Sequence, residues 1–155
     1  MANIQINRIK NKLKDLFNDK IYMENVTATN NSSEFEKMWY SRAYSAYSTF
    51  LLGSESVDEA ATSVTDGFDD YGIDAIFNDK NKKILYFIQT KFSNEATGSI
   101  SEGDTHKFIR GIKKIINLDF SNFNELVIKK QSEIENALSD FDYRLEIIIC
   151  VSSNQ

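Results

Sequence analysis

Two apolar runs separated by a short polar stretch constrain the fold of this chain more than any other feature. Residues 72–77 (GIDAIF) and 84–92 (ILYFIQTKF) are rich in β-branched and aromatic residues, and the polar stretch 78–83 (NDKNKK) joins them. This pattern predicts a β-hairpin with a loop of about four residues. Alternate residues of a strand share a face. One face of the second strand should therefore carry Leu85, Phe87, Gln89 and Lys91, and the other Ile84, Tyr86, Ile88 and Thr90.

The register of this hairpin decides which polar side chains meet. If Asp79 pairs with Ile84, then Asp74 lies opposite Gln89, and cross-strand neighbours are about 5 Å apart. One face of the hairpin then carries a polar end made of Asp74, Gln89 and Lys91. A register slip of one residue would separate these groups. The competing interpretation is that all three are ordinary solvated residues at a strand edge.

The remaining periodicity predicts an α/β fold. The expected elements are a helix over 4–17, a helix around Trp39 beginning at Ser32 or Ser33, a short strand over 63–65, a helix over 104–118 capped by Asp104 or Thr105, a helix over 124–139, and a buried strand over 143–151. The sheet should be mixed and flanked by helices. A single domain over 1–155 is expected, with residues 1–32 as a helical extension and 33–155 as an α-βββ-α-β core. A hydrophobic content of 41% is enough for a substantial core.

Composition excludes several classes of protein. No segment approaches the roughly 18 apolar residues of a membrane helix, and the N-terminus lacks a secretory apolar region, so a cytoplasmic protein without a membrane partner is expected. Cys150 is the single cysteine and should be a buried thiol, which excludes an internal disulfide. His106 is the single histidine, which argues against zinc sites and histidine-based triads. The acidic loop at 66–74 also lacks the spacing of an EF-hand.

The charge distribution leaves two interpretations open. A net charge of −5 argues against a surface that is basic throughout. On the expected helix over 104–118, however, Lys107, Arg110 and Lys114 are spaced three and four residues apart and so align on one side. This stripe either contacts nucleic-acid phosphates or is a solvated helix face.

Residues 66–75 (DGFDDYGIDA), followed by an apolar strand and the Gln89-x-Lys91 element, resemble the PD-(D/E)XK nuclease superfamily in its Mrr-like variant, in which glutamine replaces the usual glutamate. More narrowly, the chain resembles the N-terminal region of the AIPR family, which is associated with abortive infection and phage resistance in bacteria. The match is concentrated in residues 58–92. The resemblance implies a restriction-endonuclease-like core. Nothing resembles the C-terminal region that such proteins carry, so a fragment or short relative of a longer protein is expected.

The resemblance also implies a chemistry: a Mg²⁺-dependent endonuclease, with Mn²⁺ as a substitute, that hydrolyses phosphodiester bonds of DNA, or alternatively of RNA. It implies that Asp74, Gln89 and the carbonyl of Thr90 bind the metal. Lys91 would orient the attacking water or help to deprotonate it, while the metal lowers the pKa of that water. An amide oxygen is neutral, so Gln89 should bind metal more weakly than a glutamate would.

Two further acids are candidates for this site. Related nucleases often present a glutamate from the first helix, which here would be Glu36, although an ordinary solvated position suits Glu36 as well. Asp70 lies four residues before Asp74, in a loop that is otherwise a polar turn. The replacement of glutamate by glutamine and the negative net charge motivate a second hypothesis, a catalytically inactive nuclease-like module that binds nucleic acid or a partner protein. A homodimer is a further expectation.

Overall fold

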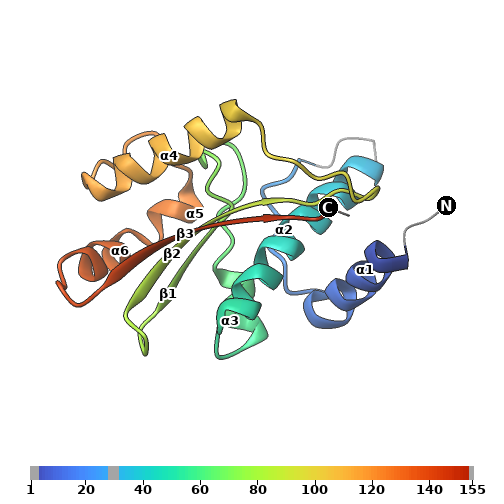
Figure 1. The fold of residues 1–155 in the computed structure, drawn as a ribbon, viewed down its shortest axis with the longest axis horizontal. Helices are drawn as coiled ribbons and strands as arrows, with labels where there is room; N and C mark the ends of the chain where they lie inside the picture. The colour runs from blue at the N-terminus through green and yellow to red at the C-terminus, as the bar shows by residue number, and fades with distance from the viewer. Residues whose placement is uncertain (1–3, 28–31, 154–155) are drawn as a thin grey trace.

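The computed structural model describes residues 4–27 and 32–153 of the chain. A three-stranded mixed sheet is flanked by helices, which gives an α/β architecture (Figure 1). The elements in chain order are α1 (Ile4–Phe17), α2 (Ser32–Leu52), α3 (Val57–Thr62), β1 (Ala75–Asp79), β2 (Ile84–Lys91), α4 (Glu102–Ile116), α5 (Glu125–Ile128), α6 (Gln131–Leu138) and β3 (Arg144–Val151).

The sheet has the order β1-β2-β3, so β2 is its central strand. β1 and β2 form the predicted antiparallel hairpin, and β3 returns parallel to β2 after the crossover through α4, α5 and α6. The predicted register is confirmed, because Asp79 pairs with Ile84 and Ile76 with Phe87. A parallel neighbour requires such a crossover, whereas a hairpin needs only a tight turn.

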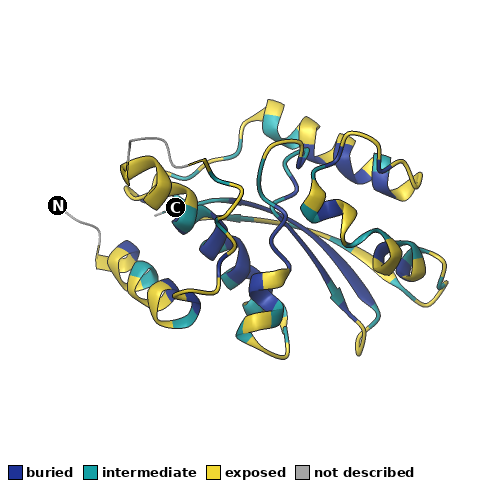
Figure 2. Cartoon of the chain, turned by 180° about the vertical axis from the view of Figure 1, so that it is seen from behind, coloured by how far each residue is buried: buried dark blue, intermediate teal, exposed yellow. Residues whose placement is uncertain are grey.

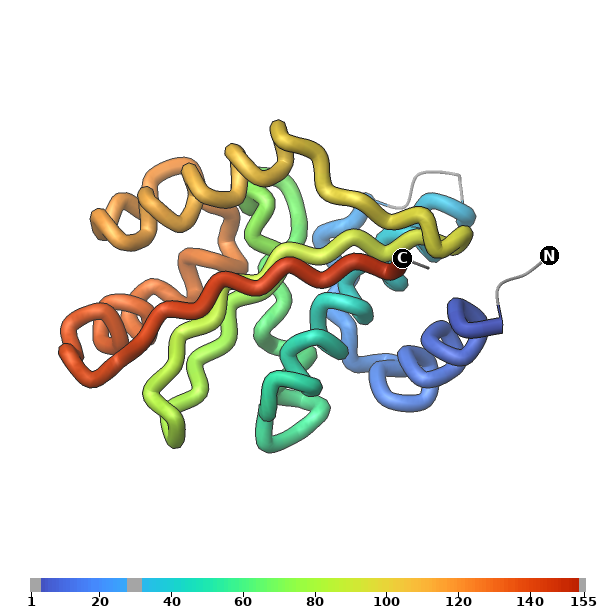
Figure 3. Tube along the Cα trace, in the orientation of Figure 1, coloured from blue at the N-terminus to red at the C-terminus, as the bar shows by residue number. Residues whose placement is uncertain are grey.

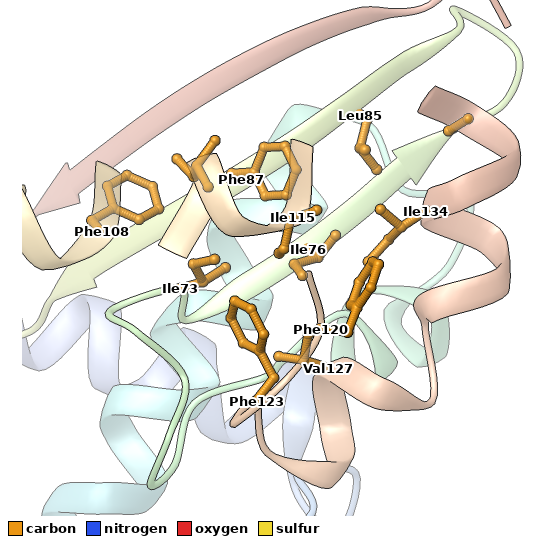
Figure 4. Packing of buried hydrophobic residues seen from close by; sticks show 12 residues of the cluster. Ile73, Ile76, Leu85, Phe87, Phe108, Ile115, Phe120, Phe123, Val127 and Ile134 are labelled. Carbon is orange, nitrogen blue, oxygen red and sulfur yellow. The ribbon is translucent and has the colours of Figure 1, made fainter. Parts of the chain in front are cut away.

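One face of the sheet packs against the helices that follow it (Figure 4). Leu85 and Phe87 of β2 and Ile76 of β1 meet Phe108 and Ile115 of α4 in a cluster that is almost fully buried. The loop after α4 and the short helices α5 and α6 extend this cluster with Phe120, Phe123, Val127 and Ile134. Apolar residues that alternate along the strands and apolar residues that recur at helical spacing on α4 therefore form one core.

The opposite face of the sheet packs against α2, through which it joins α1 and α3. β2 presents Ile84, Tyr86 and Ile88 on this side, as the alternation predicts. Small buried residues of α2 let the helix approach the sheet closely. The Ser45 hydroxyl lies 2.7 Å from the Thr90 hydroxyl, and the Thr49 hydroxyl lies 2.8 Å from that of Ser63. In Figure 2 the strands β1 and β2 are almost wholly buried between these two layers.

The structure corrects two predictions about strands. Residues 63–65 do not form a strand but a single antiparallel bridge from Val64 to Ala75, because the chain turns away into the loop that follows. β3 was predicted to be buried, yet it is an edge strand that lies beside β2 (Figure 3). Its residues are exposed or half-buried. Ile147 is 53% exposed, and the Cys150 thiol is only partly buried. No described helix packs over this strand. Whether a helix does so depends on tertiary packing, which the local sequence does not encode.

The helices after the sheet also differ from prediction. α4 begins at Glu102 rather than Asp104, because Ser101 caps it by accepting the backbone N–H of Asp104 at 3.0 Å. Ile116 is 46% exposed at the end of this helix. The expected single helix over 124–139 is two helices, α5 and α6, separated at Lys129 and Lys130. Among the described helices, none is long and apolar enough to cross a membrane.

Candidate metal centre

The loop 66–74 between α3 and β1 is closed at its neck by backbone hydrogen bonds. The N–H groups of Thr65 and Asp66 both donate to the carbonyl of Asp74, at 2.9 and 3.2 Å, and the Thr65 hydroxyl donates to the carbonyl of Ile73 at 2.6 Å. Asp66 and Asp74 are eight residues apart in sequence. The closed neck brings them together.

Asp70 is folded back into this loop. Its carboxylate accepts the backbone N–H of Gly67 at 3.1 Å and that of Gly72 at 2.7 Å, and the side chain is buried. Gly72 has a φ of +75°, and a Cβ added there would lie 2.9 Å from Nε2 of Gln89. Glycine is required at this position because the backbone is left-handed and passes close to the amide of Gln89.

Three carboxylates converge as a result. One oxygen from each of Asp66, Asp70 and Asp74 lies within 4.8 Å of the other two. Asp74 is fixed further by β2, since the Thr90 N–H donates to its Oδ2 at 2.7 Å and the Thr90 hydroxyl lies 3.4 Å from the same atom. The structure thus brings together Asp74, the predicted accessory acid Asp70, and Asp66, to which the sequence interpretation gave no role.

The electrostatics of this cluster favour a cation. Burial, followed by the neighbouring charge of Asp70, raises the pKa of Asp66 from 3.8 to about 6, against the opposing effect of Arg42. Burial, followed by the charge of Asp66, also raises the pKa of Asp74 well above its usual range. Carboxyl groups held close together in a partly buried site are difficult to ionise at the same time, because their negative charges repel each other. A bound cation would relieve this repulsion.

Gln89 places a buried amide beside this cluster. The residue is 3% exposed, and its Nε2 donates to the backbone carbonyl of Asp104 at 3.3 Å. Its Oε1 is buried and accepts no hydrogen bond from any described residue. Leaving a buried acceptor unmatched costs about 1–3 kcal/mol. Because Nε2 of Gln89 packs beside Gly72, this amide lies against the loop that carries the three aspartates.

The donor set fits a hard divalent cation. Carboxylate and amide oxygens are the ligands that Mg²⁺ prefers, and Mg²⁺ keeps several waters when it binds. Asp66, Asp70 and Asp74 would supply charged oxygens, and Gln89 a neutral one. The predicted contribution of the Thr90 carbonyl stays a prediction, although the backbone of Thr90 does lie directly against Asp74.

Lys91, at the end of β2, lies between the cluster and α4. Its Nζ is 3.2 Å from Oδ2 of Asp104, and this ion pair lowers the pKa of Asp104. The Lys91 charge also reaches the aspartates, because it opposes the rise in the pKa of both Asp66 and Asp74. An ammonium group therefore adjoins the carboxylates without forming a direct pair with them.

The basic stripe on α4 lies beside the loop, but its three members differ in their contacts. Nζ of Lys107 is 3.9 Å from Oδ1 of Asp70. Lys114 pairs with Asp119 and lies over the ring of Tyr71, with 5.6 Å between its Nζ and the ring centroid. Arg110 is exposed and forms no ion pair within the described ranges. Only Lys107 among the three contacts the acidic cluster.

Glu36 does not join the cluster. It is exposed near the start of α2, where it lines a hollow against α1 together with Lys14 and Tyr40. The residue of α2 that does reach the acidic loop is Arg42, whose Nε lies 3.7 Å from Oδ2 of Asp66. Sequence reasoning missed Arg42, since a lone arginine among the alanines, serines and tyrosines of α2 carries no motif.

Comparison with known proteins adds no family. The chain matches no protein-family model, and neither the curated proteins nor the solved structures contain a significant match.

Proposed function

We propose that this chain is a metal-dependent endonuclease domain that hydrolyses phosphodiester bonds of DNA. The observation that carries the proposal is the convergence of Asp66, Asp70 and Asp74 beside a buried Gln89 whose Oε1 has no partner among the described residues. Lys91 adds a cation at the same place. A metal ion held by these oxygens, beside an ammonium group, would suit the negative charge that develops on a phosphate during hydrolysis.

The arrangement of elements supports assigning the chain to the PD-(D/E)XK superfamily with a restriction-endonuclease-like core. A helix, α2, precedes the β1-β2 hairpin, and a helical crossover leads to the parallel strand β3. Asp74 directly precedes β1, and Gln89 and Lys91 lie near the end of β2, as the resemblance requires. On the same ground we propose a role in bacterial defence against phage, as in the AIPR family.

Each residue would have a distinct part in the reaction. When bound at such oxygens, Mg²⁺ or Mn²⁺ polarises a phosphate oxygen and lowers the pKa of a bound water. Thr90 fixes the Asp74 carboxylate through its backbone N–H, so this ligand is oriented in advance. Lys91 would hold the attacking water and offset charge on the phosphate. Lys107, next to Asp70, would face the neighbouring phosphate of the strand.

The test is cleavage of supercoiled plasmid, single-stranded DNA and RNA in Mg²⁺, Mn²⁺ or EDTA. Asp74→Asn keeps an oxygen for the Thr90 N–H but removes the charge, and cleavage should fall at least about a hundredfold, more than the loss of an outer partner to a metal ligand causes. Asp69→Asn is the matched control in the same loop, because Asp69 is exposed and outside the cluster. Equal cleavage by Asp74→Asn and Asp69→Asn would refute the proposal.

A second function is favoured by one observation. Lys91 is already paired with Asp104 at 3.2 Å, as expected of a catalytically inactive module that binds nucleic acid or a protein through the same surface. In that case Asp104→Asn would not increase cleavage, and nucleic-acid binding would be insensitive to EDTA. Metal-dependent nicking that requires Lys91 would exclude this alternative.

A further inference from the structure

A pocket adjoins the acidic cluster on the side of α2. It has a volume of about 380 Å³ and is lined by residues 25–27, the start of α2 and the loop residues 66–68. This volume is within the range of sites that take small organic groups. Asp66 lines the pocket and also belongs to the carboxylate cluster. The two sites therefore share a wall.

A buried arginine with an unused N–H lines this pocket. Arg42 is 2% exposed, and its Nη1 donates to the carbonyl of Tyr22 at 2.5 Å and to Oδ1 of Asn25 at 2.8 Å. Its Nε has no hydrogen-bond acceptor in the described part of the chain, and the Asp66 oxygen 3.7 Å away is too distant for one. The Nε atom itself has almost no accessible surface, so Arg42 contributes a buried guanidinium and its charge to the wall of the pocket.

Apolar side chains that are unusually exposed form the other walls. Phe68 is 95% exposed, Phe35 39% and Met38 37%, and all three line the pocket. Phe68 lies in the same loop as the metal-binding candidates, between Gly67 and Asp69. Exposed apolar groups gathered around a few polar ones are characteristic of a binding site rather than of a solvated surface.

The charges determine which kind of ligand fits. Asp66 offsets the charge of Arg42, and Glu34 adds a second carboxylate to the lining. These groups and the adjoining aspartates would repel an anion. A planar, neutral group with apolar faces and polar edges would suit both the aromatic walls and the polar residues beside them. A nucleobase has this chemistry, since bases stack on aromatic side chains and present acceptors to arginine.

We propose that this pocket binds one unpaired nucleobase of the strand whose phosphate lies at the Asp66–Asp70–Asp74 cluster. The inference rests on the proposed nuclease function and deepens it, because it makes a strand with unpaired bases the preferred substrate. Asp66 links the two sites, so the base and the reacting phosphate belong to the same or adjacent nucleotides.

The experiment compares a short labelled single-stranded oligodeoxynucleotide with an abasic strand of the same length. Fluorescence anisotropy in EDTA at low ionic strength measures binding without cleavage. The base-containing strand should bind about tenfold more tightly, in keeping with the stacking of one base on an aromatic side chain. Phe68→Ala should lose this preference. Phe141→Ala is the matched control, since Phe141 is also fully exposed but precedes β3, outside the pocket.

The outcomes separate this inference from the proposed function. Equal binding of both strands, no binding of either, or an unchanged preference in Phe68→Ala would overturn the base pocket. A base preference in a protein that never cleaves with Mg²⁺ or Mn²⁺ would support the pocket and refute the nuclease. Arg42→Lys should also weaken the preference, and if that variant fails to fold, the exposed Phe68 position still decides the question.

Discussion

The backbone N–H of Thr90 donates to Oδ2 of Asp74 at 2.7 Å, and this bond joins the acidic loop to the central strand. It is the one interaction that lowers the pKa of Asp74 through the backbone, against a larger rise from burial and from Asp66. The carboxylate is therefore held in place by an uncharged donor and left with most of its charge uncompensated. This combination suits a metal ligand better than a structural ion pair.

Metal binding should stabilise the protein against heat. A ligand that binds only the folded state at a hundred times its Kd raises the free energy of unfolding by about 2.7 kcal/mol. We expect Mg²⁺ and Mn²⁺ to raise the Tm of the wild-type chain in differential scanning fluorimetry, and Asp74→Asn to abolish the rise. Asp69→Asn should respond like the wild type. An equal metal-induced shift in Asp74→Asn would place the cation elsewhere.

Without metal, stability should fall as pH rises through the titration of the cluster. The pKa of Asp66 is about 6 in the folded chain and about 3.8 when unfolded. The folded state therefore holds more protons between these two values. Its extra stability is fully present below pH 3.8 and lost as pH rises to about 6. Asp104, Asp119 and Asp140, whose pKa values are lowered, act oppositely below pH 3.8.

Urea unfolding measured between pH 4.5 and 7.5 tests this dependence. The wild type in EDTA should become less stable across the range. Asp66→Asn should reduce the slope, because one of the two carboxyls with a raised pKa is gone and the other, Asp74, loses the neighbouring charge of Asp66. Saturating Mg²⁺ should also flatten it. A slope unchanged by Asp66→Asn would show that Asp66 does not titrate in this range.

Removing the Lys91 charge should separate catalysis from metal binding. Lys91→Met keeps the length of the side chain, and cleavage should fall about a hundredfold or more, as expected for the loss of a proton-transfer group. The metal-induced rise in Tm should persist, because Lys91 is a cation near the cluster and not a ligand. Lys113→Met, at an exposed position on α4, is the control. Loss of the thermal shift together with cleavage would instead give Lys91 a structural role.

The contact between α4 and the acidic loop should be intolerant of added volume. A Cβ at Gly111 would lie 2.6 Å from Cβ of Tyr71, so Gly111→Ala should destabilise the chain by about 1–3 kcal/mol. Gly103→Ala, in the first turn of the same helix, meets only the Ser101 hydroxyl at 3.8 Å and should be neutral or stabilising. Thermal unfolding of the two variants decides this, and equal stabilities would contradict the packing.

The hairpin and its register were predictable because they depend on local sequence. The alternation in β2 and the polar turn at 78–83 determine which residues share a face, and the polar group of Asp74, Gln89 and Lys91 follows from counting. The period of α1 likewise predicts its bounds. These features require no knowledge of distant segments.

The third carboxylate and the buried arginine depend on tertiary structure instead. Asp66 meets Asp74 only because Thr65 closes the neck of the loop, and Arg42 reaches it only because α2 packs across the sheet. Glu36 is one of several polar residues on α2. The helical periodicity of α2 alone does not show which of these residues faces the loop. The exposure of β3 is similarly a property of what surrounds the strand.

Gly111 gives the site a mechanical property. Because Tyr71 sits where a side chain would otherwise stand, α4 rests directly on the loop that holds the three aspartates. The distance between α4, which carries the cations, and the loop, which carries the carboxylates, is thus determined by the contact between Gly111 and Tyr71, which are both uncharged. Added salt would weaken the field between these charges, but it would leave the distance between them unchanged.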